Sequence, residues 1–233
     1  MNNSENFLET YNNLDQYLNK EVRADNHVGY ANKVKNSKNA IVSRFKDELL
    51  SFGTLRNAIV HNPKIGNKAI AEPHDSTVKR FNEIYEMIIN PKKVIPTFQF
   101  DVLGAQKDDY INDILKKMKQ KSFSQFPVLD SNGTIIELIN NNTISRWLAS
   151  KIDENGTIII DGITIEKLMP EIEFKHNYKF ISRETSIYKA YDLFLNHINE
   201  KERNLDVLFI THSGRETEKL LGLITISDLS PLI

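Results

Sequence analysis

The second half of the chain contains one run of expected elements twice, and this duplication limits the fold more than any other feature. The first copy runs strand, helix, strand, turn, strand, helix, at residues 98–103, 110–119, 126–129, 130–133, 134–139 and 144–152. Apolar residues that alternate favour a strand, and apolar residues three or four positions apart favour a helix. The Asp-Ser-Asn-Gly run between two strand candidates is typical of a hairpin turn.

The second copy repeats this order after an insert. Its strand, helix, strand, turn, strand and helix are expected at residues 179–181, 184–198, 207–210, 212–214, 220–224 and 227–232. The insert between the copies, residues 153–175, has its own turn at 153–156 and its own strand at 157–160. One copy alone would leave a face of a small sheet exposed, so we expect two stacked copies that bury a shared core. The copies span residues 92–152 and 176–233.

The residues before this repeat are expected to be helical. The first helix has an apolar face made by Phe7, Tyr11, Leu14 and Leu18. Ser4 is expected to cap it, and a second helix should bend or end at Gly53, with Thr54 capping the next. A further helix is expected to start at Ser76 or Thr77 and to end before Asn90-Pro91. The predicted fold class is α+β: an all-α helical bundle at residues 1–91, followed by a tandem βαββα pair.

Composition excludes several classes of protein. Hydrophobic residues make up 40% and charged residues 26%, which is globular usage rather than that of a disordered chain. The chain has no Cys, which rules out disulfides, thiolate metal sites and cysteine nucleophiles. The histidines lack the spacing of a zinc site, so no metal is expected.

The same survey bears on location and on charged partners. No apolar run approaches the roughly 18 residues that span a bilayer, so no membrane partner is expected. The N-terminal residues do not resemble a signal peptide, so a cytoplasmic location is expected. The net charge of −1 provides no general attraction to nucleic acid or membrane. Any such attraction must be local.

Residues 222–229 carry the run Gly-Leu-Ile-Thr-Ile-Ser-Asp-Leu. This run resembles the signature that ends a CBS (cystathionine β-synthase) domain. Residues 126–130, Phe-Pro-Val-Leu-Asp, resemble the middle strand of that domain, and residues 183–187 fit the start of its helix. Together the two copies resemble a CBS pair over residues 94–233. The resemblance implies a regulatory protein, expected as a homodimer, that binds an adenine nucleotide such as AMP, ADP or ATP.

The chemistry of this signature suits a nucleotide. Thr225 offers a hydroxyl at a strand-to-helix junction, and the N–H groups near Ser227 and Asp228 would favour an anion. The Asp228 carboxylate can accept both ribose hydroxyls, as acidic residues do in dinucleotide folds. The resemblance also implies adenine contacts from Phe180, Ser182 and Leu208. The alternative is structural, since a Thr at a strand end and an Asp in a helix cap are both common.

The first copy departs from the signature. Its matching positions hold Glu137 for the Gly, Asn140 for the Thr and Thr143 for the Asp. Without the carboxylate, a ribose would lose its charged acceptor. We therefore expect at most one competent site in each chain, built mainly by the second copy.

The helical region carries a second resemblance. Arg56, Asn57 and His61 form an Arg-Asn-x-x-x-His pattern, similar to that of the HEPN family of small helical bundles. The family implies a metal-independent ribonuclease site shared across a dimer. Asn57 and His61 are four positions apart and share a helix face. His61 would act as general acid or base, Arg56 would stabilise the phosphorane charge, and Asn57 would orient the groups. Basic residues outnumber acidic ones between 33 and 80, which favours an anionic partner such as RNA.

The helical region also has a plainer interpretation. Many bundles of this shape are inert modules for dimerisation or protein contact, and a charged His61 near a helix C-terminus is favoured by the macrodipole. Three hypotheses therefore stand. The chain is a nucleotide sensor that acts through protein contacts, a nucleotide-regulated ribonuclease that uses Arg56 and His61, or a ligand-free dimerisation scaffold.

Overall fold

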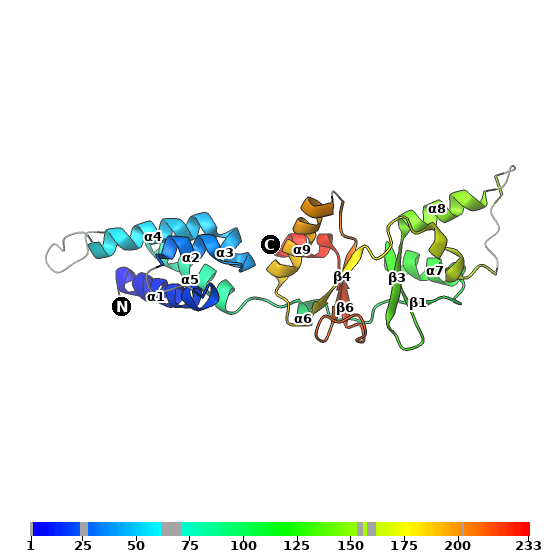
Figure 1. Cartoon of the computed structure of the whole chain (residues 1–233), viewed down its shortest axis with the longest axis horizontal. Helices are drawn as coiled ribbons and strands as arrows, with labels where there is room; N and C mark the ends of the chain where they lie inside the picture. The colour runs from blue at the N-terminus through cyan, green and yellow to red at the C-terminus, as the bar shows by residue number, and fades with distance from the viewer. Residues whose placement is uncertain (1, 24–27, 62–70, 153–155, 158–161, 202) are drawn as a thin grey trace. The chain divides into compact units, whose positions relative to one another are not determined.

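The computed structural model describes residues 2–23, 28–61, 71–152, 156–157, 162–201 and 203–233. The chain divides into two compact units, Met1–Lys92 and Lys93–Ile233 (Figure 1). Most of the turn and strand predicted at 153–160 lies outside the described residues, which include only Gly156 and Thr157 of that stretch.

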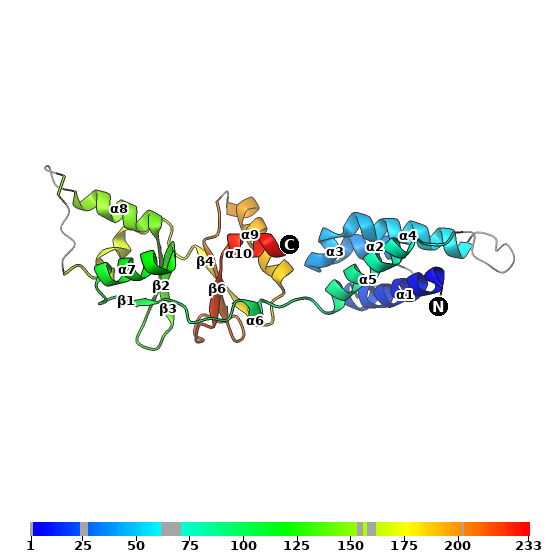
Figure 2. The same cartoon turned by 180° about the vertical axis from the view of Figure 1, so that it is seen from behind.

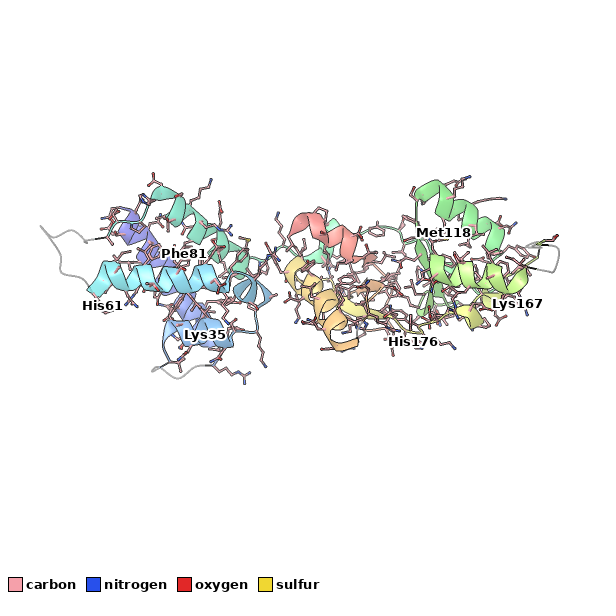
Figure 3. All side chains as sticks on the ribbon, turned by 90° about the horizontal axis from the view of Figure 1, so that it is seen from above. Lys35, His61, Phe81, Met118, Lys167 and His176 are labelled. Atoms are coloured by element: carbon pink, nitrogen blue, oxygen red, sulfur yellow. The ribbon has the colours of Figure 1, made fainter. Side chains whose placement is uncertain are left out.

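The described elements of the first unit are helices, as predicted. It contains α1 (Asn3–Glu21), α2 (Tyr30–Asn36), α3 (Ala40–Arg44), α4 (Lys46–His61) and α5 (Asp75–Ile89). The predicted apolar face of α1 is buried. Three rings from three helices meet in the core, with centroids 5.0 Å apart for Phe7–Phe81 and 4.5 Å apart for Phe52–Phe81. Figure 3 shows Phe81 inside this unit, with His61 at the end of α4.

The start of α1 differs from the prediction. Asn2, not Ser4, is the N-cap: its Oδ1 accepts a hydrogen bond from the Glu5 N–H at 2.8 Å, and the Glu5 carboxylate accepts one from the Asn2 N–H at 3.1 Å. This is a capping box, which satisfies two otherwise unpaired donors. Ser4 lies inside the first turn, and its hydroxyl donates to Glu72 Oε2 at 2.5 Å. Its role is therefore a tertiary contact.

The predicted break at Gly53 is also absent. Helix α4 continues from Lys46 to His61, and the Thr54 hydroxyl donates to the carbonyl of Leu50 within the helix at 3.3 Å. A Cβ added to Gly53 would lie 3.0 Å from Cδ1 of Tyr30. The glycine thus allows a tyrosine ring from α2 to pack against the backbone of α4.

The second unit contains the predicted repeat. The first copy has β1 (Ala105–Gln106), α7 (Ile111–Lys121), β2 (Gln125–Leu129), β3 (Ile135–Asn140) and α8 (Asn141–Lys151). The second copy has β4 (Tyr178–Ser182), α9 (Ile187–Lys201), β5 (Val207–Thr211), β6 (Gly222–Ile224) and α10 (Ile226–Leu229). The described part of the unit also contains the short 3₁₀ helices η1 (Ile165–Lys167), η2 (Met169–Glu171) and η3 (Ser230–Leu232).

Both copies build the same three-stranded sheet. The order is β1-β2-β3 in the first and β4-β5-β6 in the second. The first strand pairs in parallel with the second, and the second pairs antiparallel with the third, in each sheet. The predicted turn at 130–133 is confirmed, because Asp130 Oδ1 accepts from the N–H groups of Asn132 and Thr134, and Gly133 has a φ of 78°. The predicted α+β fold class is confirmed.

The strand predicted at 98–103 is wrong. The strand of this region is the two-residue β1, and helix α6 (Val94–Thr97) precedes it. The N–H of Val94 donates to the carbonyl of Thr185 at 2.9 Å, and the N–H of Phe100 to that of Leu221 at 3.3 Å. Val94, Ile95 and Phe98 belong to the core of the second copy, so their apolar pattern reflects contact with that copy. Figure 2 shows α6 beside β6.

The two copies meet through a separate apolar cluster. Leu138 of β3 is buried with Val207 and Phe209 of β5, and Tyr178 and Phe180 of β4 pack against them. The shared core that the duplication predicts is therefore present. Leu223 of β6, which packs against this cluster, also lines the cavity described next.

Candidate functional site

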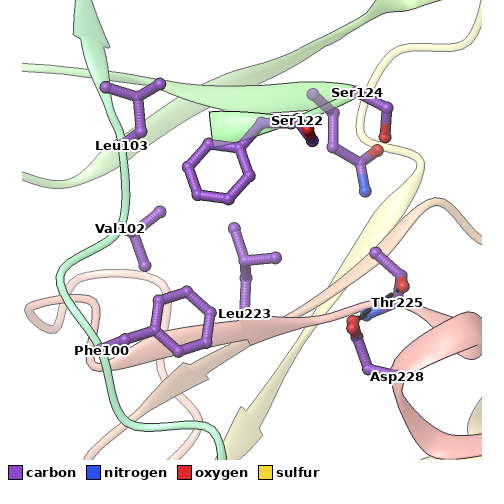
Figure 4. A pocket seen from close by; sticks show the side chains of 10 residues that line it. Phe100, Val102, Leu103, Ser122, Ser124, Leu223, Thr225 and Asp228 are labelled. Atoms are coloured by element: carbon purple, nitrogen blue, oxygen red, sulfur yellow. Dashed lines mark hydrogen bonds between the residues drawn. The ribbon is translucent and has the colours of Figure 1, made fainter. Parts of the chain in front are cut away.

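A cavity of about 220 Å³ lies where the two copies meet. Its lining consists of Phe100, Val102, Leu103, Ser122, Phe123, Ser124, Gln125, Leu223, Thr225 and Asp228 (Figure 4). The first three come from the segment that crosses between the copies, the next four from the end of α7 and start of β2, and the last three from β6 and α10. The cavity is somewhat smaller than the roughly 300–1,000 Å³ of sites for drug-sized ligands, so it suits a small molecule.

Thr225 and Asp228 stand together at one side of this cavity. Strand β6 ends at Ile224, and Thr225 is the N-cap of the single-turn helix α10. Both the N–H and the hydroxyl of Thr225 donate to Asp228 Oδ2, at 2.7 and 2.8 Å. Oδ1 of Asp228 takes no part in this pair. The structural alternative of a helix cap is therefore present, and it leaves one carboxylate oxygen for a ligand hydroxyl.

The predicted anion position at the start of α10 has weak geometry. The helix has four residues, so few peptide dipoles add along its axis. The N–H of Asp228 already donates to the carbonyl of Thr225 at 3.2 Å. Attraction of a phosphate would have to come from elsewhere in the cavity.

The sequence analysis did not identify the aromatic residues that line the cavity together with Thr225 and Asp228. Phe100 and Phe123 are large and partly exposed, at 44% and 39% of their surface. The signal for Phe123 is its position after Ser122, which has a left-handed φ of 56° at the C-cap of α7. A non-glycine residue in that conformation often marks a functional or closely packed turn. For Phe100, no local pattern indicates that its segment crosses to the second copy.

The three residues predicted to contact adenine lie outside the cavity lining. Leu208 is fully buried in the core of the second copy, opposite Ile224. The ring of Phe180 packs against Phe209 with centroids 5.7 Å apart, and the hydroxyl of Ser182 donates to the carbonyl of His212 at 3.2 Å. Their role in adenine binding stays a prediction.

The matching positions of the first copy line another cavity, also of about 220 Å³. Asn140 caps α8 and accepts from the N–H of Thr143 at 3.0 Å. The matching pair of the second copy bonds in the opposite sense, since Thr225 donates to Asp228. Two acidic residues, Glu173 and Asp206, line this cavity together with Arg203. Glu137, in the place of the signature glycine, is buried, and its two oxygens accept from the N–H of His176 at 3.1 and 3.2 Å. The expectation of at most one competent site stays a prediction.

The three residues singled out in the helical unit lie close together. Arg56 Nη1 is 3.1 Å from His61 Nε2 and 3.3 Å from Asn57 Oδ1. A guanidinium only donates, so Arg56 is the donor wherever this contact is a hydrogen bond. The Arg56 guanidinium lies 5.4 Å from the ring centroid of Tyr11, and burial raises the pKa of that tyrosine to about 12. The pattern therefore forms a local cluster on α4.

Two further properties concern metals and membranes. Within the described ranges, no group of three or more His, Asp or Glu side chains is arranged to hold a metal ion. The helices in the described part of the chain are too short or too polar to cross a membrane.

Several solved structures have similar folds at low sequence identity. The CBS domain pair of MJ0100, solved with methylthioadenosine and S-adenosyl-L-methionine, is 16% identical with a TM-score of 0.43, over 61% of this chain and 95% of that one. OpuCA of Staphylococcus aureus is 14% identical with a TM-score of 0.41, over 58% and 95%. The CBS domain protein TA0289 of Thermoplasma acidophilum, of unknown function, is 14% identical with a TM-score of 0.44, over 61% and 70%.

Comparison with curated proteins found no match. The family model of the CBS domain matches residues 99–150. This is the first copy, whose terminal run departs from the signature, whereas residues 222–229 of the second copy carry the run that suggested the resemblance. The repeated topology extends the same arrangement to the second copy. The predicted tandem pair is confirmed as the topology of this unit, and residues 99–150 match the CBS domain.

Proposed function

We propose that the unit Lys93–Ile233 binds a small adenosine-containing ligand in the cavity beside Thr225 and Asp228, and that binding regulates the helical unit. One observation carries the proposal. The cavity brings a carboxylate from the second copy face to face with apolar walls from the crossing segment and the first copy. The match of residues 99–150 to the CBS domain agrees with this proposal.

Different side chains of the cavity would contact the base and the ribose of the ligand. Phe100, Val102 and Leu223 offer apolar surface for a flat base, since rings gain from stacking and from leaving water. Asp228 Oδ1 accepts a ribose hydroxyl. A hydrogen bond to a charged acceptor is worth about 1.5–3 kcal/mol, so this carboxylate dominates the polar recognition.

The proposed regulation rests on the fact that residues of both copies line the cavity. A ligand that touches both copies favours the arrangement in which they face each other, and a ligand shifts an equilibrium only by its difference in affinity for two states. Phe100, which lines the cavity, belongs to the segment that follows Lys93 and packs on the second copy. This segment follows α5 in the chain, and a change in its packing is the route by which we propose that the ligand acts on the helical unit.

Thermal unfolding with adenosine compounds tests this proposal. A ligand at 100 times its dissociation constant adds about 2.7 kcal/mol to the stability of the native state. We expect stabilisation of the parent chain and its loss in Asp228→Ala. The control is Asp108→Ala, since Asp108 is an exposed residue outside the cavity lining. No stabilisation by any adenosine compound would favour the ligand-free scaffold.

A second candidate function rests on the cluster of Arg56, Asn57 and His61. The short contact between Arg56 and His61 is what favours it. In the proposed metal-independent ribonuclease, His61 transfers a proton and Arg56 stabilises phosphorane charge. His61→Ala should abolish RNA cleavage, whereas His74→Ala, an exposed histidine at the start of α5, should not. Equal cleavage by His61→Ala and the parent would reject this function.

Partners of the helical unit belong to the same proposals. A homodimer would bring two copies of the Arg56–His61 cluster within reach of one RNA, and a protein partner would serve the sensor. Sedimentation of the full chain, with and without RNA, separates these cases.

A further inference from the structure

We infer that the cavity beside Asp228 selects a nucleoside without phosphate groups over its phosphorylated forms; this rests on the proposed function. Charge carries the inference. Among the described residues that line the cavity, Asp228 is the one that bears a charge, and that charge is negative. The remaining side chains are apolar or neutral: Phe100, Val102, Leu103, Ser122, Phe123, Ser124, Gln125, Leu223 and Thr225.

Among the described residues of this lining, a phosphate would find no positively charged partner. Phosphates are held most strongly by cations and charge-assisted donors. The N–H and hydroxyl of Thr225 both donate to Asp228, and the N–H of Asp228 donates to the Thr225 carbonyl. Hydroxyls of Ser122 and Ser124 and the amide of Gln125 are neutral donors. A phosphate would also face the Asp228 carboxylate, and like charges at short range repel.

A nucleoside suits the same lining. Its hydroxyls are donors, which is what a carboxylate requires, and its base is flat and largely apolar. A positively charged substituent on the ribose would be attracted to Asp228. The cavity, about 220 Å³, therefore has the charge and lining for a compact molecule that is neutral or cationic.

A lysine outside the cavity is a possible partner for a phosphate group. Lys119 lines an adjoining groove that shares Ser122, Phe123 and Ser124 with the cavity. A phosphorylated ligand would have to extend out of the cavity to reach it. Lys119→Ala therefore belongs in the test.

Isothermal titration of the full chain provides the first arm, with adenosine and methylthioadenosine against AMP and ATP. We expect the two nucleosides to bind at least tenfold more tightly than AMP. Equal or tighter binding of AMP or ATP would overturn the inference and leave the proposed function standing. Binding of none of the four compounds would overturn both.

Two variants form the second arm. Asp228→Asn keeps an acceptor oxygen but removes the charge, so the preference for adenosine over AMP should fall several-fold. Asp108→Asn removes the same charge from an exposed turn and should leave the preference unchanged. Equal preferences in these two variants would overturn the inference.

Gln125→Lys and Lys119→Ala complete the test. Gln125→Lys places a cation in the lining and should raise the affinity for AMP more than that for adenosine. Lys119→Ala should leave the preference as in the parent chain. Weaker AMP binding in Lys119→Ala would show that a phosphate is held in the adjoining groove, which contradicts the inference.

Discussion

Lys33 is a charged side chain in the interior of the helical unit. It is 7% exposed, and its Nζ lies 2.9 and 3.0 Å from the two carboxylate oxygens of Asp15, whose side chain is 32% exposed. Removing one partner of a buried pair leaves the other charge uncompensated, at a cost of about 3–5 kcal/mol in fully buried cases. Because Asp15 is partly solvated, the value here should be lower.

We predict that Asp15→Asn lowers the free energy of unfolding by about 2–3 kcal/mol. Lys33→Met keeps the aliphatic stem, removes the buried charge and should cost less. Urea denaturation followed by circular dichroism measures both. Lys35→Met, at an exposed position of the same helix, should change stability by less than about 0.5 kcal/mol. If Asp15→Asn costs no more than this control, the ion pair does not stabilise the unit.

At Gly53 we expect a Gly→Ala substitution to lower stability, which is the opposite of its usual effect within a helix. Replacing a helix-interior glycine by alanine ordinarily stabilises by about 1 kcal/mol. Here the new Cβ would lie 3.0 Å from Tyr30 Cδ1, and overpacking costs about 1–3 kcal/mol. Gly53→Ala should therefore destabilise by about 1–2 kcal/mol in a urea titration. Ser51→Ala, at an exposed position of the same helix, serves as the control, and a stabilising Gly53→Ala would contradict the packing argument.

At this scale the sequence predicts residues whose role is local. The signature draws attention to Thr225 and Asp228, whose cap is built from neighbours in the chain. Phe100 could not be found, since its place in the cavity depends on a crossing between copies. The cap of α1 was misplaced by two residues, because Asn2 and Ser4 are both good caps and the tertiary bond to Glu72 decides between them.

Among the elements, the loop between β5 and β6 contains a pH-dependent bond. Hydrogen bonds from the Ser213 hydroxyl and N–H hold the pKa of Glu218 down at about 2. A carboxyl whose pKa is lower in the folded than in the unfolded state stabilises above its unfolded pKa, near 4.5, and loses that contribution as the pH falls towards 2.

We predict that the free energy of unfolding of Glu218→Gln decreases less between pH 4.5 and pH 2 than that of the parent chain. Urea titrations at pH 6 and pH 3 should show a smaller difference for this variant than for the parent chain. Glu216→Gln, an exposed neighbour in the same loop, is the control. If Glu218→Gln loses as much stability between pH 6 and pH 3 as the parent chain, the hydrogen bond to Ser213 does not form in solution.

Strand β6 depends on a glycine at its crossing with the segment before β1. A Cβ on Gly222 would overlap the backbone carbonyl of Phe98, whereas a Cβ on Gly104 would meet the end of the Leu129 side chain. A flexible side chain can turn aside, but a backbone that is hydrogen-bonded on both sides cannot. Alanine at either position should destabilise the protein, and the change at Gly222 should cost more than the change at Gly104.

We predict that Gly222→Ala lowers the free energy of unfolding by more than about 3 kcal/mol, and Gly104→Ala by about 1–2 kcal/mol, within the range of overpacked sites. Denaturation followed by tryptophan fluorescence measures both. The reverse order would show that the crossing segment leaves β6 readily.

Most elements were predictable because their apolar periodicity is local. Helix α7 and strands β2 and β3 lie within two residues of their expected bounds. The exception at 98–103 has the composition of a strand, but its apolar side chains have different surroundings. Phe98 lies in the core of the second copy, Leu103 packs against the core of the first, and Phe100 lines the cavity. Pattern alone cannot distinguish a residue buried by its own sheet from one buried by another.

For the whole molecule, the question is whether the two units act together. The chain has one tryptophan, and Trp147 is fully buried in the core of the first copy. Its fluorescence therefore reports on the unit Lys93–Ile233, whereas the circular dichroism signal at 222 nm includes the helices of both units. The two signals can follow one sample through unfolding and separate the responses of the two units.

We predict that adenosine at 100 times its dissociation constant raises the midpoint of the fluorescence transition by roughly 5–10 °C. If ligand binding controls the helical unit, the dichroism transition of that unit must shift as well, because linkage between sites is reciprocal. Gly53→Ala identifies this transition, since it alters only the helical unit. A shift confined to fluorescence would leave the ligand site intact and reject the proposed control, because a ligand that does not change the stability of the helical unit cannot regulate it through that equilibrium.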